Sequence, residues 1–324
     1  MFSFRHNITR VQQFCLSILL FKANVVNLCV VKLCVNSINL MKRSFIIAVI
    51  MLFCIFDADA WGVLGHRTIA AIAEENLTPE AKAATEKYLN ASLPSVALWM
   101  DQAASWNKKR KNYIPGWELT SLWHTLVVDE KHQVSSKTTP KGSGKLVPGL
   151  KMCVENLKNY RNLTDSAVVV NLKCVIHMMG DMHCPTHIYY LEFPDCFRGE
   201  KDANGKRTPA RDRILVYFND KKMTYHSFWD GVGISQIYPE KSKDYKFYAE
   251  KFGKASAKQK AKVCKGDIDD WVHDSAKNCR QVYNNVKAGD HLDRDFILSY
   301  SKMTQKQCLK GGCRLAHILN ECFK

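Results

Sequence analysis

Residues 175–190 read VIHMMGDMHCPTHIYY. In this mostly apolar stretch His177 and Asp181 are four residues apart, and the pattern of apolar residues predicts a helix. On a helix that spacing puts an imidazole and a carboxylate on one face, as a metal ion requires from two ligands of a single helix. Pro185 predicts that the helix ends just before it, so that His187 lies past the break and can turn toward a different metal ion.

A second pair repeats this geometry in residues 225–231, YHSFWDG, where His226 and Asp230 are again four apart. A single pair of this kind is explained equally well by metal binding and by a capped or hydrogen-bonded histidine of the core. Two pairs, together with His124 in the apolar segment LWHTLVVD, indicate a site for more than one metal ion. Asp101 adds a carboxylate among apolar and aromatic neighbours, where it is costly unless it is paired or bound to metal.

The first sixty residues predict a discarded leader. Residues 41–60 read MKRSFIIAVIMLFCIFDADA: a basic start, an apolar run too short to span a membrane, and an Ala-x-Ala cleavage site ending at Ala60. An N-terminal membrane anchor is the alternative, because residues 15–35 are also apolar. We interpret residues 1–40 as an upstream extension, 41–60 as a signal peptide and 61–324 as one catalytic domain. This domain would be secreted or lumenal, without stable membrane insertion.

Composition narrows the class of protein. The chain has 324 residues, 46% of them hydrophobic and 24% charged, which excludes a disordered or collagen-like chain. Without residues 1–60 the net charge falls from +16 to +12, which favours a polyanionic partner. Nine cysteines and three glycosylation sequons remain, at Asn76, Asn90 and Asn162. The pairs Cys264–Cys279 and Cys308–Cys313 are the nearest in sequence, although spacing alone cannot decide disulfide pairing.

The apolar periodicity predicts an all-α fold. Thr78 and Pro79 mark the start of the second of two helices in residues 66–90. A short strand is predicted at residues 214–218, and long surface loops at 130–147 and 192–212. Further helical segments are predicted at residues 95–109, 148–161, 166–184, 223–236, 267–288 and 313–322.

The predicted mature chain begins WGVLGH, residues 61–66. A free α-amine titrates near pH 8, so a metal ion can displace its proton, and the amine can chelate together with its own carbonyl oxygen. With this start, the motifs around Asp101, His124, His177–His187 and His226–Asp230 follow in an order that resembles the S1/P1 nuclease family. These are secreted, zinc-dependent single-strand nucleases and 3′-nucleotidases, and the resemblance covers the whole of residues 61–324.

The resemblance implies three zinc ions. The first ion would be held by four side chains. A second ion close to it would be held by His66, by the amine and carbonyl of Trp61, and by Asp181, which would bind both ions. The third would be held by His187, His226 and Asp230. The four ligands of the first ion are Asp101, His124, His177 and Asp181. Zinc would activate a water, neutralise phosphate charge and stabilise the departing 3′-oxygen.

Asp129 matches the water-orienting acid of the family, and the alternative is a carboxylate at the edge of a loop. The implied activity is hydrolysis of single-stranded DNA and RNA to 5′-phosphonucleotides, with 3′-nucleotidase activity on mononucleotides, by a monomer. Single strands suit such a site because their bases can be splayed out. Zinc phospholipase C is the alternative enzyme, since it is related in fold and ligands. A secreted basic protein that binds polyanions, with structural zinc, is the alternative from another class.

Overall fold

The computed structural model describes residues 61–103, 122–136, 144–191 and 214–324, all within one compact unit, Ala58–Lys324. Helices dominate this unit and strands are few and short, so the predicted all-α class is confirmed. The predicted loop at 192–212 lies outside the described residues. No helix in the described ranges is both long and apolar enough to cross a membrane.

The helices and turns of the described part follow one another closely along the chain. The α-helices are α4 (His66–Glu74), α5 (Pro79–Leu89), α6 (Leu93–Val96), α7 (Trp99–Ala103), α8 (Leu146–Lys158), α9 (Asp165–Asp181), α10 (Tyr225–Phe228), α11 (Tyr245–Gly253), α12 (Ala257–Val263), α13 (Ile268–Cys279), α14 (Arg294–Ser299) and α15 (Ser301–Cys322). Single-turn 3-10 or π segments are η1 (Trp61–Gly65), η3 (Tyr160–Asn162), η4 (Pro185–His187), η7 (Trp229–Gly233), η8 (Ile234–Gln236), η9 (Pro239–Lys241) and η10 (Arg280–Tyr283).

Helix α9 forms the centre of the fold. It packs against α8, α4 and α15, and its inward face is fully buried over its last two turns. The helix begins where the Oγ1 of Thr164 accepts a hydrogen bond from the backbone N–H of Ala167, which satisfies one of the free amides of the first turn. It ends at Asp181, and Pro185 then opens the 3-10 turn η4, as the proline predicts.

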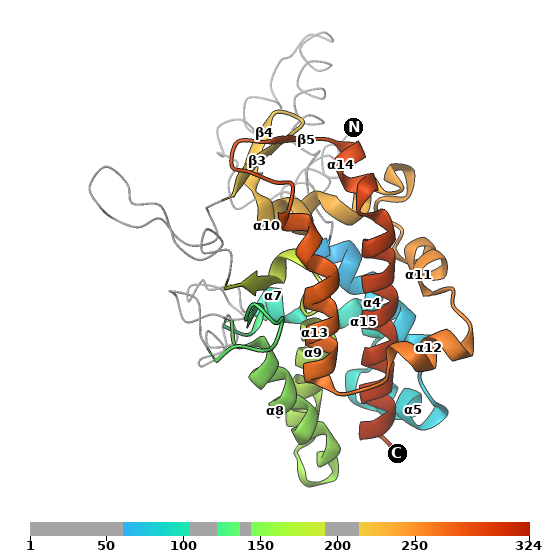
Figure 1. Ribbon diagram of the computed structural model, residues 1–324. Coiled ribbons are helices and arrows are strands. Elements are labelled where there is room, and N and C mark those ends of the chain that lie inside the picture. The colour runs from blue at the N-terminus through green and yellow to red at the C-terminus, as the bar shows by residue number, and fades with distance from the viewer. Residues whose placement is uncertain (1–60, 104–121, 137–143, 192–213) are drawn as a thin grey trace, which may run out of the picture. The chain divides into compact units, whose positions relative to one another are not determined.

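Helices α4 and α15 pack against each other and against α9. Helix α15 packs along α4, and the two are seen side by side in Figure 1. Helix α5 starts as predicted, with Pro79 in its first turn and the Oγ1 of Thr78 accepting from the N–H of Ala81. The sequence motifs of α4 and α9 are therefore held next to each other by the burial of apolar helix faces.

Two small sheets complete the fold. Strand β1 (Leu126–Val128) pairs in parallel with β2 (Ile188–Tyr190), with Leu126 opposite Ile188. Strand β3 (Leu215–Phe218), predicted from alternation, pairs antiparallel with β4 (Lys221–Thr224) and parallel with β5 (His291–Leu292). The first sheet matters for the site, because His124 precedes β1 and His187 precedes β2.

Neither cysteine pair suggested by sequence proximity forms, because all four thiols are free. Cys308 and Cys313 are five residues apart on α15 and project to different sides of that helix. The Sγ of Cys264 instead lies 3.4 Å from the carbonyl oxygen of Cys313. Cys279 at the end of α13 is fully buried, next to Cys184.

The three sequons differ in their surroundings. Both polar atoms of the Asn76 side chain form hydrogen bonds: Nδ2 donates to the carbonyl of Ile72, and Oδ1 accepts from the Nζ of Lys260. Asn90 and Asn162 are exposed at the end of α5 and in η3. Glycosylation stays a prediction, and Asn90 and Asn162 offer the accessible amides.

Candidate metal centre

The site is built around Asp181, the last residue of α9. Its carboxylate is buried, and both of its oxygens face ring nitrogens of histidines. Oδ1 lies 3.2 Å from Nε2 of His66 and 3.1 Å from Nδ1 of His187. Oδ2 lies 3.1 Å from Nδ1 of His124 and 3.2 Å from Nε2 of His177. Four of the predicted imidazole ligands therefore converge on one predicted bridging carboxylate.

The angles of these close contacts do not meet the geometry of a hydrogen bond. Among the described residues, neither oxygen of Asp181 has a partner in hydrogen-bond geometry, and the same holds for the buried Nδ1 of His66 and Nε2 of His124. A buried carboxylate without hydrogen bonds is strongly unfavourable. A metal ion removes that cost, because the lone pairs of imidazole nitrogens and carboxylate oxygens can all point at a cation. The residues present therefore fit a metal centre.

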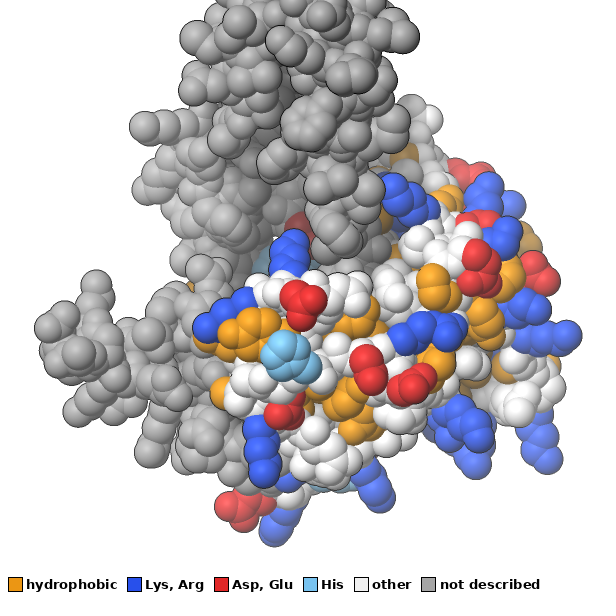
Figure 2. Space-filling model, turned by 90° about the horizontal axis from the view of Figure 1, so that it is seen from above, with side chains coloured by type: hydrophobic (Ala, Val, Ile, Leu, Met, Phe, Trp, Pro, Cys, Tyr) orange, Lys and Arg blue, Asp and Glu red, His pale blue; other side chains and the backbone are white. Residues whose placement is uncertain are grey.

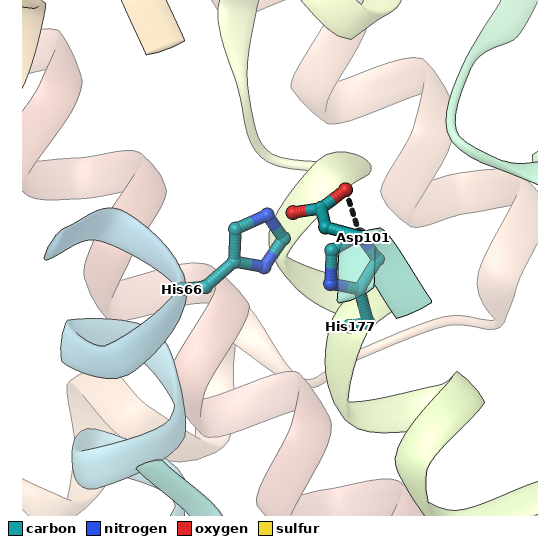
Figure 3. A group of neighbouring side chains, drawn as sticks. All are labelled: His66, Asp101 and His177. Atoms are coloured by element: carbon teal, nitrogen blue, oxygen red, sulfur yellow. Dashed lines mark ion pairs between the residues drawn. The ribbon is translucent and has the colours of Figure 1, made fainter. Parts of the chain in front are cut away.

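The first group of ligands joins α4, α7 and α9. Figure 3 shows His66, Asp101 and His177 pointing toward one another from these three helices. The Oδ1 of Asp101 lies 3.5 Å from Nε2 of His177 and 3.5 Å from Nδ1 of His124. The Nδ1 of His177 donates to the carbonyl of Ala97 at 2.8 Å, which leaves Nε2 as the ligand atom.

The second group lies where η4 meets η7. The Nε2 of His187 is 3.2 Å from Oδ1 of Asp230, and the Nε2 of His226 is 2.9 Å from Oδ2 of the same carboxylate. The Nδ1 of His187 donates to the carbonyl of His124 at 2.6 Å, and the Nδ1 of His226 to that of Thr186 at 3.1 Å. Backbone carbonyls thus orient both rings so that Nε2 faces the carboxylate.

The sequence profile of the S1/P1 nucleases matches residues 61–324. The chain belongs to the S1/P1 nuclease family. Endonuclease 5 of Arabidopsis thaliana is 25% identical over 315 residues, which cover 87% of this chain and 97% of the relative. Endonuclease 2 of the same plant is 25% identical over 315 residues, covering 89% and 99%. This S1/P1 nuclease is therefore a metal-dependent phosphodiester hydrolase that acts on nucleic acid.

The charges of this S1/P1 nuclease site favour a cation. Burial opposes the ionised form of Asp181, but His177 and His187 outweigh it and hold the pKa of Asp181 well below its usual range. Burial likewise opposes protonation of His177, yet Asp181 and Asp101 raise its pKa to about 9. Burial also acts against the charge on Asp230, whose pKa is nevertheless lowered by His226 and His187. The carboxylates of Asp181 and Asp230 therefore stay ionised at neutral pH, and a bound metal ion would replace the proton that His177 carries without one.

The close approach of α4 and α9 depends on Gly180. A Cβ at this position would collide with the Nδ1 and Cε1 atoms of His66. The His66 ring instead stacks on the ring of His177, with centroids 4.2 Å apart and planes 8° apart. The absence of a side chain at Gly180 thus lets His66 reach Asp181.

The backbone of Trp61 starts η1, which leads directly into His66 and α4 and packs against η7, the segment that carries Asp230. Its predicted ligation by a free amine requires cleavage after Ala60 and stays a prediction. The position is consistent with it, since η1 runs directly into His66 of the first ligand group and packs against η7, which carries Asp230 of the second.

The structure places Asp129 in a turn. Its Oδ1 accepts hydrogen bonds from the backbone N–H groups of Lys131 and Gln133, at 2.9 and 2.8 Å. None of the contacts recorded for Asp129 within the described ranges involves the metal ligands. This is the loop-edge role that the sequence left open, and the water-orienting role stays a prediction.

Sequence reasoning missed Cys184. Its Sγ lies 3.6 Å from Oδ1 of Asp230, and with His187 and Asp230 of the second group it could hold a metal ion. The residue stands inside the stretch that revealed the other ligands, directly before Pro185, but a single cysteine there has no periodicity to mark it. His183, in contrast, turns away from the site, with Nδ1 donating to the carbonyl of Met179 and Nε2 3.0 Å from the guanidinium of Arg314.

Proposed function

We propose that this chain is a secreted, zinc-dependent endonuclease that hydrolyses single-stranded DNA and RNA to 5′-phosphonucleotides and removes phosphate from 3′-nucleotides. The observation that carries the proposal is the buried Asp181 carboxylate, which faces four imidazole nitrogens at 3.1–3.2 Å without a hydrogen bond from any part of the chain that the structure describes. A ligand set of imidazoles and carboxylates suits zinc. The family match, which begins at Trp61, supports both the activity and a mature chain starting at that residue.

Three ions are proposed, each with its own set of ligands. One is held by Asp101, His124, His177 and Asp181, a second by Trp61, His66 and Asp181, and the third by His187, His226 and Asp230. Zinc in these sites would supply an activated water at neutral pH, neutralise charge on the phosphate and stabilise the leaving 3′-oxygen.

The backbone of the chain orients the imidazole rings that would bind the ions. The carbonyls of Ala97, His124 and Thr186 each accept the Nδ1 proton of one imidazole, so the Nε2 atoms are fixed as ligands before an ion arrives. The side chain of Asp101 is 49% exposed and those of His226 and Asp230 are each 28% exposed, in contrast to the buried Asp181. Substrate would therefore reach the ions across the exposed ligands Asp101, His226 and Asp230.

A phosphodiester backbone is the favoured substrate because of charge. Lys and Arg side chains stand around the outline of the described surface in Figure 2, with Asp and Glu among them, so attraction comes from the net positive charge of the chain. Single strands are favoured over duplexes because an unpaired base can leave the stack and enter a site beside the phosphate.

The decisive experiment compares substrates. Purified protein should release acid-soluble nucleotides with 5′-phosphates from single-stranded DNA and RNA faster than from duplex, and inorganic phosphate from 3′-AMP. Chelation should stop both reactions, and zinc should restore them. Release of phosphocholine from lecithin without nucleotide release would instead identify a phospholipase C. Tight, salt-sensitive binding of nucleic acid without turnover would identify a binding protein.

We also propose that Asp129 orients the attacking water. Asp129→Asn keeps the Oδ1 acceptor for the amides of Lys131 and Gln133 but removes the negative charge. The expected result is a lower kcat with an unchanged unfolding midpoint and an unchanged metal count. An unchanged kcat would leave Asp129 only its role in the turn.

A further inference from the structure

Cys184 lies at the bend between α9 and η4. Its backbone is extended, with φ −77° and ψ 127°, and its carbonyl accepts a hydrogen bond from the N–H of His187 at 3.2 Å. This tight turn brings the Cys184 thiol and the His187 imidazole to the same carboxylate, that of Asp230. Cys184 is completely buried, whereas Asp230 is partly exposed, so the thiol reaches the carboxylate from the protein interior.

Two of the distances among these three side chains match those between the ligands of one ion, and the third is at most 4.8 Å. The Sγ of Cys184 is 3.6 Å from Oδ1 of Asp230, the Nε2 of His187 is 3.2 Å from the same oxygen, and all three ligand atoms lie within 4.8 Å of one another. Zinc bonds of about 2.3 Å to sulfur and about 2.0 Å to nitrogen and oxygen, at tetrahedral angles, give separations of about 3.5 Å and about 3.3 Å.

The surroundings of the thiol also differ from those of a cysteine that only packs. Its Sγ faces the carboxylate of Asp230 and the hydroxyl of Thr186, at 3.6 and 3.9 Å. A thiol is a weak hydrogen-bond donor, so these long contacts contribute little by themselves. A thiolate, in contrast, is a strong ligand for zinc.

We propose that Cys184 is a thiolate ligand of the ion held by His187, His226 and Asp230. Binding replaces the S–H bond by a sulfur–metal bond and releases one proton to solvent. The partly exposed side of His226 and Asp230 stays open for a substrate oxygen, since zinc can expand from four to five ligands. A sulfur ligand makes this position selective for soft ions such as Zn²⁺ and Cd²⁺ over Mg²⁺ and Mn²⁺.

The test replaces zinc by cobalt. This inference rests on the proposed three-ion centre. The number of cobalt ions bound tests the centre, and the charge-transfer band tests the ligand role of Cys184. The wild-type protein, stripped by a chelator and reloaded with Co²⁺, should bind three ions and show a thiolate-to-cobalt charge-transfer band in the near ultraviolet. Cys184→Ala should abolish the band and weaken one ion by more than about 100-fold, beyond the 10–100-fold typical of a residue that only hydrogen-bonds to a ligand.

The matched control is Cys308→Ala. Cys308 is an equally buried thiol near Cys184, but no contact recorded in the described part of the chain links it to His187, His226 or Asp230. This variant should keep the band. If Cys184→Ala does not fold, cadmium NMR of the wild-type protein replaces it, and one of the three signals should be shifted downfield by sulfur.

Three results would overturn the inference: three bound cobalt ions without the band, a band that persists in Cys184→Ala, or a disulfide between Cys184 and Cys279 found by mass spectrometry. In each of these cases the three-ion centre itself could stand. Wild-type protein that binds no cobalt at all would overturn both the metal centre and the role of Cys184.

Discussion

At residue 181 a single carboxylate joins two parts of the site, because its two oxygens face different histidines. Asp181→Asn keeps the shape of the side chain but removes its charge and one acceptor. We expect activity on single-stranded DNA to fall to below about 1% of the wild type, since loss of about 3 kcal/mol of transition-state stabilisation costs more than 100-fold. Metal analysis should show fewer bound ions. Asp165→Asn, an exposed change in the first turn of the same helix, should alter neither value.

Gly180 illustrates a residue that acts without touching a ligand ion. Gly180→Ala would force the His66 ring away from α9, because the new Cβ overlaps that ring. Overpacking of this kind costs about 1–3 kcal/mol of unfolding free energy. We expect a lower midpoint in urea together with loss of one ion, the one assigned to His66. Ser166→Ala, exposed near the start of α9, is the control. Wild-type metal content in Gly180→Ala would show that His66 does not depend on this contact.

At the scale of elements, α13 and α15 are joined by a partly buried ion pair. The guanidinium of Arg314 donates to Oδ2 of Asp274 at 2.6 Å, and Lys310 donates to Oδ1 at 2.8 Å. Burial opposes ionisation of Asp274, but these two hydrogen bonds outweigh it and lower its pKa. The pair therefore stabilises the fold above the unfolded pKa of about 3.9, and this contribution is lost as the pH falls through the lower folded pKa.

Asp274→Asn tests this link. Breaking a fully buried pair costs about 3–5 kcal/mol, but the side chain of Asp274 is 35% exposed, and solvent screening reduces the expected loss to about 2 kcal/mol at pH 7. Urea unfolding at pH 7 and at pH 3 should show that the difference between wild type and variant shrinks in acid. A difference that is equal at both pH values would mean that the charge of Asp274 is not the source of its contribution.

Some features of the helices and strands could be predicted from the sequence and others could not. The pair of His177 and Asp181 followed from spacing within one helix, which is a local property. The parallel pairing of β1 with β2 was not predicted, because three-residue strands carry no clear alternation and their partners are far apart in the chain. That pairing nevertheless brings the carbonyl of His124 to His187. Helix α15 begins at Ser301 and not near residue 313, since polar residues in its first turns obscure the apolar face.

At the scale of the whole molecule, the ligand positions become a site only when distant segments meet. The resemblance assigned nine ligand residues, and the structure gathers all of their side chains except that of Trp61, which its described backbone does not settle. Cys184 lay outside that assignment because the family pattern says nothing about it. A sequence pattern thus identifies shared ligands, whereas a residue particular to one chain emerges from distances.

The proposed site also depends on cleavage of the leader from the rest of the chain. In the uncleaved chain the nitrogen of Trp61 is an amide without a lone pair for a metal, and cleavage after Ala60 turns it into an amine that can bind one. We therefore expect protein that begins at Trp61 to bind three zinc ions, and protein that retains Ala58–Ala60 ahead of it to bind two. Metal analysis of the two forms, purified in the same buffer, measures this directly. Three ions in the extended form would show that the second ion is held without the amine, by His66 and Asp181 alone.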